Sequence, residues 1–296
     1  MVFFMAGFFG FFNYSKAGPG VSKDAPRKRG FFLFFELFFR KFWKFIQVNM
    51  LYFIVSIPML ALLLFYTTFF LTPDLASFMG EAGEVSEADM TYVILTLNFT
   101  LTFLIWNIFG AGPATAGFSY ILKNYADEEH AWVFSDFFEK FKKNFKQCAA
   151  MVLIDAVALF LGCVSLRFYL MPNGLGVWGT IMGTVTALVW IMFTTMHFYI
   201  YPMIVTFDLK LKDILKNALI FSQIKLPSNI LILLLNLIIY IGFFILASVS
   251  PLAWLLIFLL VPSFVGFMNV FFAHSHIKKI MIPEKEKTES ESTFND

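Results

Sequence analysis

Residues 109–147 read FGAGPATAGFSYILKNYADEEHAWVFSDFFEKFKKNFKQ, a polar and basic stretch between long apolar runs. Its glycines and proline end the helix that arrives from the N-terminal side, because glycine is permissive and proline lacks a backbone donor. Proline suits the first turn of a helix, so a new helix is predicted to begin at about Pro113. Small side chains around it let another helix approach closely. We assign the break and the close packing to Gly110, Gly112, Pro113, Ala114, Thr115 and Ala116.

A second, amphipathic helix is predicted after the acidic residues 127–129, with phenylalanines on one side and lysines on the other. So much apolar surface must be covered by lipid, by the protein's own helices or by another protein. We expect residues 113–125 to pack against a membrane bundle and residues 134–145 to lie beneath it. The predicted surface for a partner or for lipid consists of Phe137, Phe138, Phe141, Lys140, Lys143 and Lys146.

The composition places the chain in a bilayer. It is 59% hydrophobic and only 14% charged, whereas soluble domains are about 45–50% apolar and about 25% charged. The sequence therefore predicts an all-α fold, a polytopic membrane helix bundle of about six transmembrane helices. The six apolar runs lie near residues 47–71, 91–109, 148–170, 177–202, 229–248 and 252–273.

The loops differ sharply in charge. All 22 Lys and Arg residues except Arg167 lie in the N-terminal segment, in the stretch 109–147, in the connection 205–229 and in the tail after residue 273. The positive-inside rule makes these segments cytoplasmic, so both termini are predicted to be inside.

The domain organisation follows from this charge pattern. Residues 1–30 are predicted to be a flexible N-terminal segment, with Met1 or Met5 as the start. A membrane domain over 31–280 includes an interfacial amphipathic helix at 31–45 and cytoplasmic segments at 110–147 and 204–228. Residues 281–296 form a charged tail.

One acidic and one basic side chain fall inside predicted spans. Asp155 and His197 lie at about the same depth from the cytoplasmic ends of the third and fourth spans, about 11 Å in, so they could meet. An intramembrane carboxylate costs roughly 2.5–3.5 kcal/mol on insertion scales, and Asp155 should therefore face a partner. Two interpretations stay open: a proton or ion relay, and a hydrogen bond that pins two helices together.

The remaining titratable clusters indicate no catalytic chemistry. Asp127, Glu128 and Glu129 beside His130 could form a metal site or the acidic start of a helix, and the helix start is the prediction. His274 and His276 beside two lysines are predicted to contact lipid headgroups. No nucleophile, phosphate-loop, zinc-protease or dinucleotide motif is present. We expect no enzyme, cofactor or metal, and no nucleic-acid partner.

Several segments resemble the YesL family of bacterial membrane proteins, whose function is not established. The resemblance rests on Gly-Pro-Ala-Thr-Ala at 112–116, Asp-Glu-Glu at 127–129, Asp-Phe-Phe at 136–138 and residues 142–147. Residues 13–30, 37–45 and 201–218 fit the same family. The chain departs from the family at 58–108, because the family passes quickly from its first apolar run to the Gly-Pro-Ala-Thr-Ala segment. The resemblance implies the bacterial plasma membrane and genes placed beside those for carbohydrate uptake.

Two functions from different classes remain. The first is a non-catalytic accessory or regulatory protein whose partners are the lipid bilayer and a carbohydrate ABC transporter or another membrane protein. The second is a small-solute or sugar transporter with a route lined by Asp155, His197 and Asn98, Asn107 or Asn236. Transporters usually need several polar groups at mid-depth, and this chain has few, which favours the accessory function.

Overall fold

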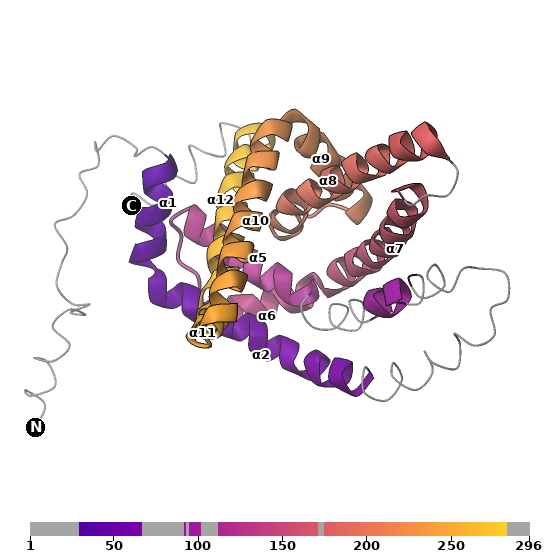
Figure 1. The fold of residues 1–296 in the computed structure, drawn as a ribbon. Helices are drawn as coiled ribbons and strands as arrows, with labels where there is room; N and C mark the ends of the chain where they lie inside the picture. The colour runs from indigo at the N-terminus through magenta and orange to yellow at the C-terminus, as the bar shows by residue number, and fades with distance from the viewer. Residues whose placement is uncertain (1–29, 67–91, 93–94, 102–111, 171–174, 283–296) are drawn as a thin grey trace, which may run out of the picture.

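The computed structural model describes residues 30–66, 92, 95–101, 112–170 and 175–282, and the regular elements among them are all helices (Figure 1). Residues 1–29 and 283–296, and with them the predicted N-terminal segment and most of the tail, lie outside this part of the chain. The helices are α1 (Gly30–Arg40), α2 (Phe42–Tyr66), α5 (Gly112–Ala126), α6 (Val133–Lys143), α7 (Phe145–Leu170), α8 (Gly176–Thr206), α9 (Leu211–Ile224), α10 (Leu226–Val249), α11 (Leu252–Leu259) and α12 (Val261–Met281).

Three of the described helices, α7, α8 and α10, are long and apolar enough to cross a membrane. They correspond to the third, fourth and fifth predicted spans. The first predicted span falls on α2, whose apolar described part is the shorter Phe42–Ile57. The second, residues 91–109, lies mostly outside the described residues.

The sixth predicted span, residues 252–273, is wrong as one continuous helix. The chain breaks at Leu260, between α11 and α12. Pro262 explains the break, because proline has no backbone N–H to donate to the carbonyl of Phe258 four residues earlier, its ring clashes with that carbonyl, and it suits the first turn of the next helix. The amide of Asn49 on α2 donates a hydrogen bond to the carbonyl of Phe258, which the end of α11 leaves without a helical partner.

The predicted interfacial helix 31–45 is also divided. Helix α1 ends at Arg40, and α2 begins at Phe42. Phe34, Leu37 and Phe38 of α1 are buried in the core, whereas Phe31, Phe32 and Phe39 are exposed. The helix therefore has one side on the protein and an aromatic side that suits a lipid interface.

Helix α5 is the centre of the fold and packs against α2, α6, α7, α8 and α12. Most of its residues are buried, because small side chains let these neighbours approach. On α12, a Cβ atom added to Gly266 would meet the ring of Phe118 at 2.5 Å, which shows how closely the two helices lie. Residues of α5 contribute to both hydrophobic clusters of the core, one with α1, α2 and α12 and one with α8 and α9.

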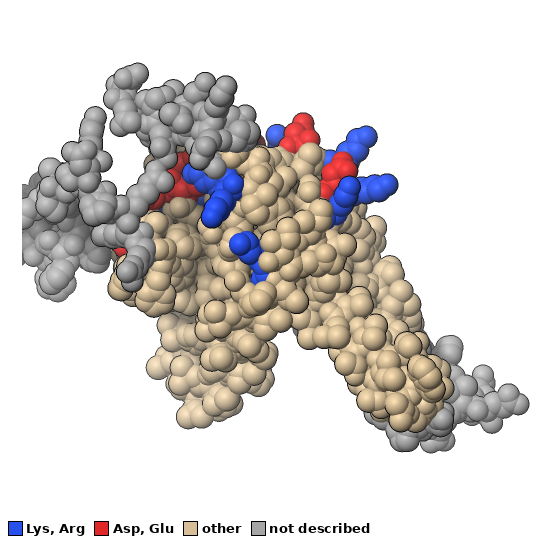
Figure 2. Space-filling model, turned by 90° about the horizontal axis from the view of Figure 1, so that it is seen from above, with Lys and Arg blue, Asp and Glu red and all other residues tan. Residues whose placement is uncertain are grey.

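Charged side chains gather mainly along one side of the molecule, and two projections with no charged side chain visible in this view extend away from it (Figure 2). Helices α7 and α8 pack on each other, and α10 packs on α11 and α12. Their outer surfaces are apolar and exposed, as for Val177 and Val249 at 76% and 79%. Such extended apolar surface is stable only in contact with lipid or with another protein.

Candidate functional site

A pocket of about 440 Å³ lies between α7 and α8. On α8, the lining residues follow the pattern i, i+3, i+4, i+7, i+11, so they share one face of the helix: Trp190, Phe193, Thr194, His197 and Tyr201. Asp155 and Leu159 of α7 have the same spacing and line the opposite wall, together with Phe99. The pocket is thus mainly aromatic and apolar, with the carboxylate of Asp155 and the imidazole of His197 facing each other within it.

The structure brings Asp155 and His197 together. The imidazole Nε2 lies 2.9 Å from Oδ1 of Asp155, and Nδ1 lies 3.0 Å from the carbonyl oxygen of Phe193. A carbonyl oxygen can only accept, so Nδ1 must carry a proton to make this bond. One further proton must then lie between Nε2 and Oδ1. The pair keeps both bonds either as imidazolium and carboxylate or as neutral imidazole and carboxylic acid.

Asp155→Asn is predicted to be milder than Asp155→Ala. The asparagine amide can donate to the bare Nε2 of a neutral imidazole, whereas alanine leaves Nε2 without its partner, a loss of about 1–3 kcal/mol. Thermal unfolding of the purified variants in detergent measures the difference. Equal stability of the two variants would contradict a contact that holds the helices together.

The asparagines predicted to extend this site do not all reach it. Asn236 of α10 donates to the side chain of Asn269 on α12 at 2.9 Å, an interhelical bond away from the pocket lining. Asn107 lies outside the described residues. Neither Asn98 nor Asn236 lines the pocket, and its polar side chains among the described residues are Asp155, His197, Thr194 and Tyr201.

A second polar cluster forms around Asp127, which joins α5 to α12. His274 Nε2 lies 2.7 Å and Lys278 Nζ 3.2 Å from its carboxylate oxygens, and Lys123 Nζ lies 3.6 Å away. Burial raises the pKa of Asp127, but the hydrogen bond from His274 and the charges of His274, Lys123 and Lys278 together lower it to about 2. Asp127 is therefore an ionised link between distant segments.

This cluster corrects two predictions. His274 is only 3% exposed and donates to Asp127, so it does not contact lipid headgroups. The acidic residues 127–129 do not begin α6 either. Asp136 takes that place, and its carboxylate accepts the backbone N–H of Trp132 at 2.9 Å. Among the described residues, no group of three His, Cys, Asp or Glu side chains is arranged to hold a metal ion.

Glu128 occupies a position where glycine is usual. Helix α5 ends in a Schellman motif, with bonds from the N–H of Glu129 to the carbonyl of Asn124 and from the N–H of Glu128 to that of Tyr125. Glu128 therefore adopts a φ of 62°, a conformation that strains residues with a side chain. Its carboxylate lies 2.6 Å from the guanidinium of Arg40, which ties α1 to the end of α5.

Helix α6 packs directly on α5. A Cβ atom added to Gly117 would lie 2.5 Å from the carbonyl oxygen of Phe137 and 2.9 Å from its ring. Phe137 is fully buried, and Phe138 and Phe141 are half-buried against the same core. Phe137 is thus covered by the protein's own helix and is not a surface for a partner. The exposed aromatic residues of this region are Trp132 and Phe134, at 70% and 69%.

The basic side of α6 also differs from the prediction. Lys140 lies over the ring of Tyr120, 4.6 Å from its centroid, and pairs with Glu139, so its side chain is only 17% exposed. Lys142 and Lys143 at the end of α6 and Lys146 at the start of α7 are exposed instead. The prediction omitted Lys142 because the basic side that it assumed runs through Lys140, Lys143 and Lys146.

Gly110, in the predicted break, lies outside the described residues, whereas Gly112 to Ala116 form the buried start of α5.

The structure defines a helical membrane protein with a compact layer of charged and amphipathic helices at one side. A family model described as "Protein of unknown function, DUF624" matches residues 92–166, less than half of the chain. This region contains α5, α6 and Asp155 but not His197. Proteins of the YesL family contain DUF624, so the match agrees with the resemblance in the sequence. No curated protein and no solved structure gives a match.

Proposed function

We propose that this protein is a non-catalytic accessory or regulatory component of a bacterial plasma membrane, and that its cytoplasmic helices bind a partner with an acidic surface. The observation that supports this most is the side of α6 and α7 that exposes Lys142, Lys143 and Lys146, held on a buried α5. A rigid, solvent-facing basic surface suits recognition of an acidic partner.

The partner proposed is a carbohydrate uptake transporter of the ABC class. This part of the proposal rests on the resemblance, since YesL-type genes lie beside carbohydrate uptake genes. It also requires both termini and the layer of α5, α6 and α9 to be cytoplasmic, with six crossings. The gathering of charges on one side of the described structure agrees with that orientation (Figure 2).

Reversing Lys142, Lys143 and Lys146 to glutamate is predicted to leave a folded protein that no longer binds its partner. These side chains are exposed, so each change should alter stability by about 0.5 kcal/mol or less. A photo-cross-linking residue at exposed Phe134 would capture the transporter from native membranes. Labelled-oligosaccharide uptake in a deletion strain carrying each variant would report the functional effect.

The matched control reverses Lys212, Lys216 and Lys279, three exposed lysines of α9 and α12, with the same change in net charge. It should retain the cross-link and the uptake. If the α6–α7 reversal still captures the same transporter subunits, this surface is not the docking site. An externally accessible cysteine label at position 143 would contradict the cytoplasmic placement.

The pocket between α7 and α8 supports a second candidate, a transporter for a small solute. A cavity of about 440 Å³ that contains one Asp–His pair could bind a solute and hold a proton. Uptake by the purified protein in liposomes tests this function. Uptake that Asp155→Asn abolishes, with an unchanged unfolding temperature, would favour the transporter, and no uptake by the original protein would exclude it.

A further inference from the structure

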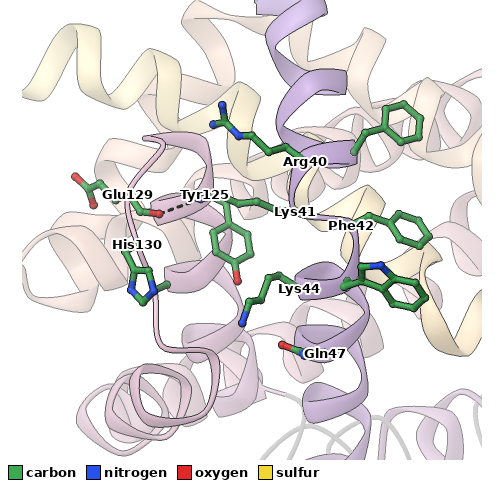
Figure 3. A pocket seen from close by; sticks show the side chains of 11 residues that line it. Arg40, Lys41, Phe42, Lys44, Gln47, Tyr125, Glu129 and His130 are labelled. Atoms are coloured by element: carbon green, nitrogen blue, oxygen red, sulfur yellow. Dashed lines mark hydrogen bonds between the residues drawn. The ribbon is translucent and has the colours of Figure 1, made fainter. Parts of the chain in front are cut away.

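A larger pocket, of about 990 Å³, lies where α1 turns into α2 and the chain leaves α5 (Figure 3). Arg40, Lys41 and Lys44 line it from the α1–α2 junction. Tyr125 and Glu129 line the other side, together with Gln47, His130 and aromatic residues of α1 and α2. The pocket is separate from the Asp155–His197 pair, and no step of the proposed function uses it.

Tyr125 places an unsatisfied hydroxyl in this pocket. The residue is only 2% exposed, yet its oxygen has no hydrogen-bond partner within the described part of the chain. Burial, and then the charge of Asp136, raise the pKa of Tyr125, so the hydroxyl keeps its proton and can donate. In Figure 3 it points toward the ammonium end of Lys44. A buried donor without an acceptor loses about 1–3 kcal/mol, which a bound acceptor would restore.

The charges around this hydroxyl favour an anion. Lys41 donates to the carbonyl of Glu129 at 2.9 Å, and Arg40 pairs with Glu128. Burial and the charge of Arg40 lower the pKa of Lys41 to about 8, although Glu128 and Glu129 oppose this. Lys44 makes no hydrogen bond or ion pair with any described residue. Three cations thus surround a space to which Glu129 adds one carboxylate.

An apolar stripe leads away from the pocket along α2. Gln47 lines the pocket, and Met50, Ile54 and Ile57 follow it at intervals of three or four residues, on the same side of the helix. These three side chains are 46%, 55% and 55% exposed. A ligand with an anionic end and an apolar chain therefore matches both surfaces at once.

We propose that this pocket binds the phosphate-bearing headgroup of an anionic membrane lipid, with the Lys44 ammonium and the Tyr125 hydroxyl as donors to the phosphate. The acyl chains lie along Met50, Ile54 and Ile57. A soluble phosphate ester offers the same anion, but it leaves the apolar stripe uncovered. The headgroup would be held where α2 begins, at the level of the exposed Trp43, an amphipathic residue typical of membrane interfaces.

Native mass spectrometry of the full-length protein in detergent tests the proposal with four probes. These are dioctanoyl phosphatidylglycerol, dioctanoyl phosphatidylcholine, dioctanoylglycerol and glycerol 3-phosphate. Phosphatidylglycerol should bind most tightly. Tyr125→Phe and Lys44→Gln should each weaken its binding by about tenfold or more, the effect of a lost hydrogen bond to a charged group. Lys216→Gln, at an exposed lysine of α9, is the control and should bind as the original does.

The unfolding temperature separates a ligand contact from a structural role. Tyr125→Phe removes no bond within the described protein, so it should unfold at the same temperature as the original in the absence of lipid. Equal binding of phosphatidylcholine or dioctanoylglycerol would overturn the proposal, as would unchanged affinity in Tyr125→Phe. Equal binding of glycerol 3-phosphate would show that the anion is soluble and would overturn the assignment to lipid.

Discussion

Replacing Asp127 by alanine is expected to lower the free energy of unfolding by about 3–5 kcal/mol, the range found when one member of a buried ion pair is removed. The substitution leaves His274, which is 3% exposed, without its acceptor, and it separates Lys123 and Lys278 from their common partner. The stability of Asp127→Asn should fall between that of the original protein and that of Asp127→Ala, because its amide oxygen still accepts from His274. Chemical unfolding in mild detergent measures these differences.

The same carboxylate makes stability depend on pH. The folded pKa of Asp127 is about 2, below the unfolded value of about 3.9. A lowered pKa stabilises the folded state above the unfolded pKa, and this contribution is lost as pH falls through the folded pKa. About 2 kcal/mol should therefore disappear between about pH 4 and pH 2, and this loss should be absent in Asp127→Ala.

Asp208 provides the control for Asp127, since it is an exposed aspartate in the connection before α9. Asp208→Ala should change stability by about 0.5 kcal/mol or less. If Asp127→Ala were as stable as Asp208→Ala, the connection between α5 and α12 would not depend on this carboxylate.

Replacing Gly117 by alanine should destabilise the protein by about 1–3 kcal/mol, and valine should do so more strongly. The new Cβ atom would lie 2.5 Å from a backbone oxygen of α6, and a backbone atom cannot move aside as a flexible side chain can. Alanine is the better helix former by about 1 kcal/mol, but the clash outweighs this gain. Partial proteolysis should then cleave the region of α6 first.

Gly242 is the matched control for Gly117. It also lies within a helix, α10, and a Cβ atom there would have nothing within 4 Å. Gly242→Ala should leave the unfolding temperature unchanged or raise it. Equal effects at the two glycines would mean that α6 does not pack on α5 as closely as the structure shows.

The sequence allowed the prediction of local features and of the residue pair that lies at a common depth. Pro113 sets the start of α5 through backbone chemistry alone, and α5 begins at Gly112. Asp155 and His197 were predicted to meet because they lie at similar distances along consecutive spans. The first inference depends on the backbone chemistry of proline, and the second on helical rise and the order of the chain.

Contacts between distant segments could not be predicted in this way. The contact between Asp127 and His274 joins residues 147 positions apart, and no periodicity relates them. The pocket beside Tyr125 depends in the same manner on how α5 meets α1 and α2. The break at Leu260 did have a signal in the sequence, Pro262. The apolar run continues on both sides of this proline and has the length of one membrane span, so the prediction followed the length of the run.

The proton shared by Asp155 and His197 responds only weakly to a membrane voltage. Moving one elementary charge across 100 mV is worth about 2.3 kcal/mol. Transfer of the proton between Nε2 and Oδ1 spans at most 2.9 Å, about a tenth of the hydrocarbon thickness. The voltage therefore changes the balance between the two proton positions by only about 0.2 kcal/mol. Since the Asp155–His197 pair has no net charge in either arrangement, the resting potential exerts no net force on the pair.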